Sequence, residues 1–280
     1  MKFDNYANYD PRATSQTLPA FLTVWPGLGS YHQELVLLGG MVPLYLCAHP
    51  TGERALPRPV TLDVDFGVSL GASAGLYGTL GSDLRAQGFR PSPAYPGRFE
   101  REVNGFTVYV DFLVEDGDQP RGTRMVDDVP ASVMPGVVRA LQTARTVSLT
   151  GTDLYGAEQQ VNARVCAVGP FLVLKLRAML HRQQGKDAFD LLYTLLHYDG
   201  GMEAAVAAFA AEATAQNPAM PDARRALETF FRDENAPGPT KAAHFVLGPA
   251  APGEAEDTRL RRLDLRRDMT LAASALLRAL

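Results

Sequence analysis

The pattern of apolar residues changes once along this chain of 280 residues, near Pro170. Upstream, short apolar runs such as "TLDVDFGVSL" at 61–70 alternate with period two, which predicts strands separated by turn residues. Downstream, "FLVLKLRAMLHRQQ" and "KDAFDLLYTLLHY" repeat apolar residues at helical spacing. The sequence therefore predicts an α+β fold, in which a mixed sheet with flanking helices is followed by a C-terminal helical lobe.

This pattern predicts three regions: an N-terminal arm with a short helix at 1–29, an α/β domain at 30–169 and a helical domain at 170–280. Asn104-Gly105, between two alternating segments, is the strongest short hairpin signal in the chain. We expect the other elements of the α/β domain to be a strand closed by glycines at 34–40, a helix with Pro43 in its first turn, a strand at 61–70, a helix at 74–89 and a second hairpin region at 145–170.

In the helical domain, helices are expected at about 202–215 and 257–280. The stretch from 236 to 253 is rich in Gly and Pro and is expected to be a linker without a helix.

Composition and charge exclude few classes of function. A net charge of −4 gives no overall attraction to nucleic acid, so contact with a polyanion would need a local basic patch. Cys47 and Cys166 are too few for a disulfide scaffold and lack the paired spacing of a zinc site, which favours a reducing cytoplasm. The polar N-terminus, and the lack of any run of about 20 apolar residues, argue against secretion and membrane insertion.

Asp63 and Asp65 lie two residues apart in an otherwise apolar strand, so their side chains share one face. Two carboxylates there repel each other unless a cation lies between them, and Mg²⁺ is held by such oxygen ligands. The plainer interpretation is a strand end whose acids face water. Asp111, mid-strand in "TVYVDFLVE", favours a metal site, because acids on neighbouring strands can converge on one pair of cations. By itself, Asp111 is equally compatible with a sheet edge.

Gly39 and Gly40 follow an apolar strand and precede the proposed helix, about twenty residues before the acids. Glycines at this place let the backbone approach a phosphate, although most glycine pairs are simple turns.

In the helical domain, Lys175 and Arg182 are seven residues apart and share one helix face, which could meet a triphosphate or be a solvated basic stripe. Lys186 and Asp187 begin the next helix, where an acid in the first turn is favoured by the helix dipole alone.

These segments resemble a known family. "LLGG", "TLDVDF" and "VYVDFLV" are similar to the nucleotidyltransferase fold related to DNA polymerase β, and "LKLRAMLHRQQGKDAFDLLYTLL" at 174–196 resembles the AbiEii-type toxin family of nucleotidyltransferases. The resemblance covers about 30–200. Two features depart from the family pattern: Met41 replaces a small polar residue after the glycines, and the loop at 48–59 is long.

The resemblance implies metal ligands, nucleotide contacts and further catalytic residues. Asp63 and Asp65 would be metal ligands with Asp111 as a third acid, Lys175 would contact nucleotide phosphates, and Asp187 would complete the catalytic set, so that the expected catalytic residues are Asp63, Asp65, Asp111, Lys175 and Asp187. The expected nucleotide-binding residues are Gly39, Gly40, Lys175, Arg182 and Lys186.

The function expected from this resemblance is Mg²⁺-dependent transfer of a nucleotidyl group from an NTP to an acceptor hydroxyl, with release of pyrophosphate. The family implies tRNA as the acceptor and a toxin role, in a toxin–antitoxin or phage-defence system, with a cognate antitoxin protein as partner. Two alternatives remain open: modification of a small molecule such as an antibiotic, and an inactive nucleotide-binding module.

Overall fold

The computed structural model describes residues 3–52, 55–72, 79–119 and 121–280. The chain forms two compact units, each assembled from separate segments. The sheet unit comprises Asp10–Tyr45 and Thr61–Ala167, and the helical unit comprises Met1–Tyr9, Leu46–Val60 and Val168–Leu280. The break before Val168 lies close to the expected boundary. The expected arm at 1–29 is instead divided between the two units, because its helical part packs on the sheet.

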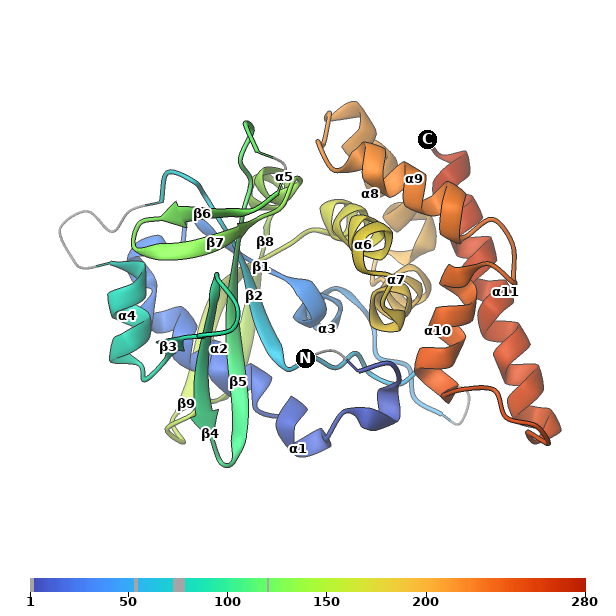
Figure 1. The fold of residues 1–280 in the computed structure, drawn as a ribbon, viewed down its shortest axis with the longest axis horizontal. Coiled ribbons are helices and arrows are strands. Elements are labelled where there is room, and N and C mark those ends of the chain that lie inside the picture. Colours follow the sequence, from blue (N-terminus) through green and yellow to red (C-terminus); the bar gives the residue numbers. More distant parts are fainter. Residues whose placement is uncertain (1–2, 53–54, 73–78, 120) are drawn as a thin grey trace. The chain divides into compact units, whose positions relative to one another are not determined.

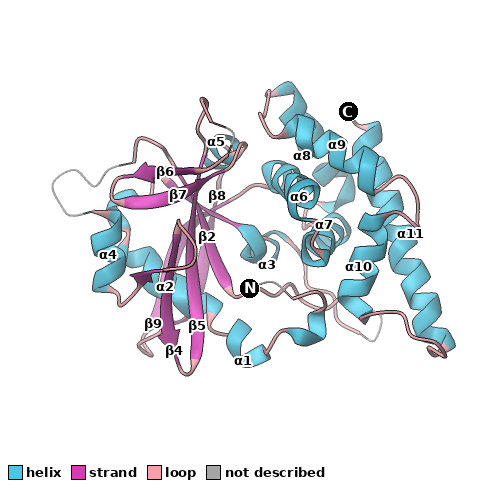
Figure 2. Cartoon of the chain, viewed as in Figure 1, coloured by secondary structure: helices cyan, strands magenta, loops and turns pink. Residues whose placement is uncertain are grey.

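The sheet unit is built on a mixed sheet, as predicted. Its main path runs β3-β4-β5-β2-β1-β9-β8, and β7 joins β6 to the end of β5. The pairs β2–β5 and β1–β9 are parallel and β1–β2 and β4–β5 are antiparallel. The described strands are β1 (Leu35–Leu38), β2 (Asp63–Val68), β3 (Arg90–Pro91), β4 (Arg98–Val103), β5 (Phe106–Val114), β6 (Thr123–Val126), β7 (Val129–Val133), β8 (Arg145–Thr152) and β9 (Glu158–Val165) (Figures 1 and 2).

Helix α2 (Thr17–Gly27) covers part of this sheet and supplies much of its aromatic core. Phe21 and Trp25 stack on each other, and both contact Phe66 of β2, which in turn stacks on Phe112 of β5. Each of these four side chains is at most 1% exposed. Burying aromatic side chains of this size is a main source of stability, so this core fixes β2 and β5 side by side.

The two expected hairpins are present. Asn104 and Gly105 connect β4 to β5 and both have positive φ, at 51° and 80°, as a type I′ turn requires. Strands β8 and β9 pair over their full length from Arg145 opposite Val165 to Thr152 opposite Glu158. The expected order of strand, glycine turn and helix is also observed, as β1, a 3₁₀ turn at Gly39–Met41, and α3 (Pro43–Leu46).

Helix α4 (Leu80–Ala86) is shorter than the helix expected at 74–89, part of which lies outside the described residues. Its first turn is held by two acids of the β6–β7 turn. Asp127 accepts from the Leu80 N–H at 2.9 Å, and Asp128 accepts from the Gly81 N–H and the Thr79 hydroxyl, each at 2.7 Å. These acids satisfy N–H groups that a helix cannot pair internally. The remaining helices assigned to this part of the chain are α1 (Pro11–Thr14) and α5 (Val137–Gln142).

The helical unit consists of helices in the part of the chain from Val168 onward, as predicted (Figure 2). Helix α6 is its central element, packing against α7, α8 and α9, and its residues from Val168 to Met179 are all buried. The helices are α6 (Val168–Arg182), α7 (Gly185–His197), α8 (Gly201–Thr214), α9 (Met220–Phe230), α10 (Pro237–Leu247) and α11 (Glu256–Arg278).

The expected linker at 236–253 is wrong over its first half, which forms α10. Its prolines, Pro237 and Pro239, fall in the first turn, where a missing N–H costs no intrahelical hydrogen bond. Ala242, Ala243 and Phe245 then bury their side chains against the unit. The tertiary contacts thus stabilise a helix that the local composition does not predict.

The first residues of the chain belong to the helical unit through aromatic contacts. The Tyr6 and Tyr9 rings lie 6.2 Å and 6.0 Å from the ring of Phe245 on α10. None of the helices in the described ranges has the length and apolarity needed to cross a membrane.

Candidate active site

Three carboxylates converge on the sheet unit where β2 and β5 run side by side. In the parallel register Asp65 lies directly opposite Asp111, and Asp63 is two positions earlier on the same face of β2. One carboxylate oxygen from each of the three residues lies within 4.8 Å of the others. The structure thus brings together the three acids that the sequence predicted, which we call the acid cluster.

Asp63 is the most enclosed member, with 6% of its surface exposed. Its Oδ1 accepts a hydrogen bond from the Thr61 hydroxyl, while the Thr61 carbonyl accepts from the Thr17 hydroxyl of α2 at 2.7 Å. This chain of contacts holds the Asp63 carboxylate in one orientation, because each group is fixed by the next.

Gly39 passes unusually close to Asp65. It has φ +69°, and a Cβ built on it would lie 1.7 Å from the Asp65 Oδ2. Only glycine fits there, for reasons of both space and backbone conformation. Gly40 is buried beside it, and Met41 turns its side chain into the core with 1% exposed, so no side-chain hydroxyl is offered at that position. The expected glycine turn therefore lies against the acid cluster.

Arg98 is a member of this site that the motif analysis missed. It stands opposite Asp111 on β4 and forms a fork with it, from Nε to Oδ1 at 2.7 Å and from Nη2 to Oδ2 at 2.6 Å. The same Nη2 is 3.7 Å from Asp63 Oδ2. These hydrogen bonds, which Arg98 donates to Asp111, raise the pKa of Arg98 above its usual range, although burial opposes this effect.

The position of Arg98 follows from the hairpin. With Asn104-Gly105 as the two-residue turn, Val103 faces Phe106 and the register continues to Arg98 opposite Asp111. The signal was therefore present in the sequence, in the distance of an arginine from a predicted turn.

The donor set of the acid cluster suits a hard divalent cation. Its members are carboxylate oxygens, the ligands that Mg²⁺ prefers, and no nitrogen or sulfur donor belongs to the group. Arg98 already acts as a positive group at this place, paired with Asp111 and 3.7 Å from Asp63.

The other predicted residues form a buried ion cluster in the helical unit. The Lys175 ammonium on α6 lies 3.2 Å from Asp187 Oδ1 and 2.6 Å from Asp190 Oδ2, both on α7. The Lys186 ammonium shares the same Asp190 oxygen at 2.6 Å. The Arg182 Nε and Nη2 groups donate to Asp187 Oδ2 and Oδ1 at 2.6 Å and 2.7 Å. Three cations and two acids therefore meet here.

This cluster argues against a solvated basic stripe at Lys175 and gives Asp187 contacts beyond helix capping. Lys175 is 4% exposed, so it does not belong to a solvated basic stripe. Asp187 does occur in the first turn of α7, but its carboxylate pairs with Lys175 and Arg182 and makes no side-chain cap. Burial lowers the pKa of the Lys175 ammonium, but Asp190 and Asp187 outweigh it and hold that pKa above its usual value.

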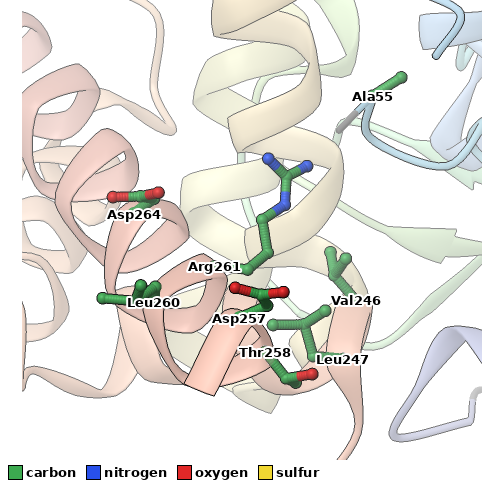
Figure 3. A pocket seen from close by; sticks show the side chains of 8 residues that line it. All are labelled: Ala55, Val246, Leu247, Asp257, Thr258, Leu260, Arg261 and Asp264. Atoms are coloured by element: carbon green, nitrogen blue, oxygen red, sulfur yellow. The ribbon is translucent and has the colours of Figure 1, made fainter. Parts of the chain in front are cut away.

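A hollow elsewhere in the helical unit, between α10 and α11, has a volume of about 430 Å³ (Figure 3). Its charged walls are Asp257, Asp264 and Arg261 of α11. The predicted site residues do not line it; the residues that do are Ala55, Val246, Leu247, Asp257, Thr258, Leu260, Arg261 and Asp264.

Comparison of the chain with protein-family models, with curated proteins and with solved structures finds no match. The family expectation therefore depends on the segments of the sequence that carry the resemblance.

Proposed function

We propose that this chain is a Mg²⁺-dependent nucleotidyltransferase, which transfers a nucleotidyl group from an NTP to an acceptor hydroxyl and releases pyrophosphate. The observation that carries the proposal is the convergence of Asp63, Asp65 and Asp111, from two neighbouring strands, within 4.8 Å. Strands disfavour acids in their interior, so three on one patch of a sheet favour binding of a cation in addition to Arg98.

In this proposal the acid cluster holds Mg²⁺, with Asp63 and Asp65 as its main ligands. The cation supplies neutralisation of the triphosphate charge and alignment of the acceptor oxygen. Asp111 would join these ligands through one carboxylate oxygen and use the other to orient the acceptor hydroxyl and accept its proton as the new O–P bond forms and the bond to pyrophosphate breaks. The Gly39–Gly40 turn allows the backbone to come close to the phosphates.

The resemblance assigns nucleotide contacts to residues of the buried ion cluster, and we keep that assignment as part of the proposal. Lys175, Lys186 and Arg182 each pair with Asp187 or Asp190 in this cluster. Among the cations, the Arg182 side chain is 40% exposed, whereas those of Lys175 and Lys186 are 6% and 3% exposed. Arg182 is thus the cation of this cluster most accessible to a ligand, and Asp187, which also pairs with Lys175, orients it.

The acceptor proposed from the family resemblance is tRNA, in a toxin whose activity a cognate antitoxin silences. Modification of a small hydroxylated molecule uses the same chemistry and differs only in the acceptor. Incubation with each radiolabelled NTP, total RNA and Mg²⁺ separates the two, because label in RNA supports the first and label only in small products supports the second.

The control variants identify the site. Asp65→Asn removes a carboxylate of the acid cluster and should abolish labelling, as should EDTA. Glu102→Gln changes an exposed acid on β4 outside the cluster and should leave labelling unchanged. Equal labelling by Asp65→Asn and the unchanged protein would contradict the proposal.

A second candidate is a non-catalytic nucleotide-binding or partner-binding module. The fork between Arg98 and Asp111 favours it, since an ion pair of this geometry supports the sheet without a metal. Under this candidate no NTP is consumed with any acceptor, and Asp63→Ala leaves Mg²⁺-dependent NTP binding unchanged.

A further inference from the structure

Arg98 uses the carboxylate oxygens that a cation would need. Both oxygens of Asp111 are engaged by its fork, at 2.7 Å and 2.6 Å, and the Nη2 group also faces Asp63 at 3.7 Å. The three side chains are 15%, 19% and 9% exposed, so little water competes for these contacts. Charge-assisted forks in such surroundings are among the stronger hydrogen-bonded pairs in proteins.

A divalent cation cannot bind Asp111 without weakening that fork, because each oxygen that it takes loses a hydrogen bond to Arg98. Asp65 stands opposite Asp111 on the neighbouring strand and adds to the field on the guanidinium. Arg98 and a cation from solution would therefore compete for the same oxygens of Asp111.

Aromatic rings contact the Arg98 guanidinium while it is paired with Asp111. Its guanidinium carbon lies 4.6 Å from the centre of the Tyr109 ring and 5.3 Å from that of Tyr95, and Tyr95 is 62% exposed. Such contacts attract a cation without using its hydrogen-bond donors. A guanidinium released from Asp111 thus keeps a favourable surface beside the site, with its N–H groups turned to a ligand.

We propose that Arg98 is a built-in counter-ion of the acid cluster, which competes with a divalent cation for Asp111 and is freed toward the phosphates when the cation binds. This inference rests on the proposed function, because it needs a cation at the acid cluster. Without a cation, Arg98 neutralises Asp111. The site becomes able to bind and transfer a nucleotide only when a cation has displaced Arg98 from Asp111.

The test is binding of Mn²⁺, which takes the same oxygen ligands as Mg²⁺, measured by calorimetry on the full chain. Arg98→Gln removes the competing charge and should raise Mn²⁺ affinity about tenfold or more, the gain expected when a charge-assisted pair need not be broken. Arg98→Lys keeps a charge but not the fork and should fall between. Arg101→Gln, on the same strand, should match the unchanged protein, since Arg101 donates to the Gln87 carbonyl and Tyr155.

A second readout guards against loss of the fold. In EDTA, Arg98→Gln should have a lower melting temperature than the unchanged protein, and Mn²⁺ should raise it by a larger increment. Equal Mn²⁺ affinity in the two proteins overturns the competition but leaves the proposed function standing, provided that Asp65→Asn lowers the affinity. Absence of saturable Mn²⁺ binding in every variant overturns both.

Discussion

The buried ion cluster predicts that removing one acid costs more than removing one lysine. In Asp190→Asn, the Lys186 ammonium loses its 2.6 Å acid partner and Lys175 must share Asp187 with Arg182. In Lys175→Met, two pairs survive, each with one cation and one acid, and the methionine fills most of the space of the lysine stem. The first change leaves excess positive charge in the interior, and the second removes it.

The two costs differ by enough to measure. Lys186 has a side chain only 3% exposed, so removing its acid partner at 2.6 Å breaks a buried ion pair, worth about 3–5 kcal/mol. Lys175→Met loses two charge-assisted hydrogen bonds but also removes the cost of burying an ammonium, and we expect about 1–2 kcal/mol. The free energy of unfolding should therefore fall by roughly twice as much in Asp190→Asn.

Urea unfolding followed by far-ultraviolet circular dichroism measures this difference, because helices α6–α11 carry much of the helical signal. The single tryptophan, Trp25, lies in the sheet unit, and its fluorescence shows whether that unit unfolds separately. Arg259→Gln is the control, because the ion pair between Arg259 and Glu256 is 57% and 64% exposed and should contribute nothing measurable.

The opposite order would refute the reasoning. If Lys175→Met lost as much stability as Asp190→Asn, or more, the count of cations and acids would not govern this cluster. The lysine would then act through contacts other than its charge.

Three further predictions concern the sheet unit and a buried thiol. Gly39→Ala should lower Mn²⁺ binding and cost about 1–3 kcal/mol, because its Cβ would lie 1.7 Å from the Asp65 carboxylate; Gly105→Ala, with a similar φ of +80° and open space around it, should keep binding intact. Asp128→Asn should cost about 1 kcal/mol at neutral pH. Although burial opposes it, hydrogen bonding lowers the pKa of Asp128. Urea unfolding at several pH values should show its contribution present above the unfolded-chain pKa of about 3.9 and lost as pH falls through the lower folded value. Burial raises the pKa of the Cys47 thiol to about 12. Mass spectrometry should find it unlabelled by a thiol reagent at neutral pH until the chain is denatured, and rapid labelling of the folded protein would contradict its burial.

The acid cluster could be predicted because its signals are local. Side-chain alternation places Asp63 and Asp65 on one face, and an acid between Val110 and Phe112 stands out against β propensity. Convergence still needed β2 and β5 to be parallel neighbours, which the alternation alone does not specify. That pairing is set by the aromatic core beneath them.

The buried ion cluster and α10 show what local patterns miss. The seven-residue spacing placed Lys175 and Arg182 on one face, but whether that face meets water depends on the acids that α7 brings to it. Likewise, the prolines at the start of α10 suggest a linker until the packing of Phe245 is known. In both cases the structure depends on contacts between separate elements, so a local sequence pattern does not predict it.

The segment Leu46–Val60 leaves the sheet unit after α3, joins the helical unit, and the chain then returns to begin β2. During synthesis, all segments of the sheet unit have left the ribosome once Ala167 emerges. The segment Leu46–Val60 instead belongs with residues from Val168 onward, which are made more than a hundred residues later. Its buried Cys47 pairs in a β-bridge with Tyr198, a residue made much later. In a nascent chain, Cys47 would therefore remain without this partner until the residues of α7 and Tyr198 have been made.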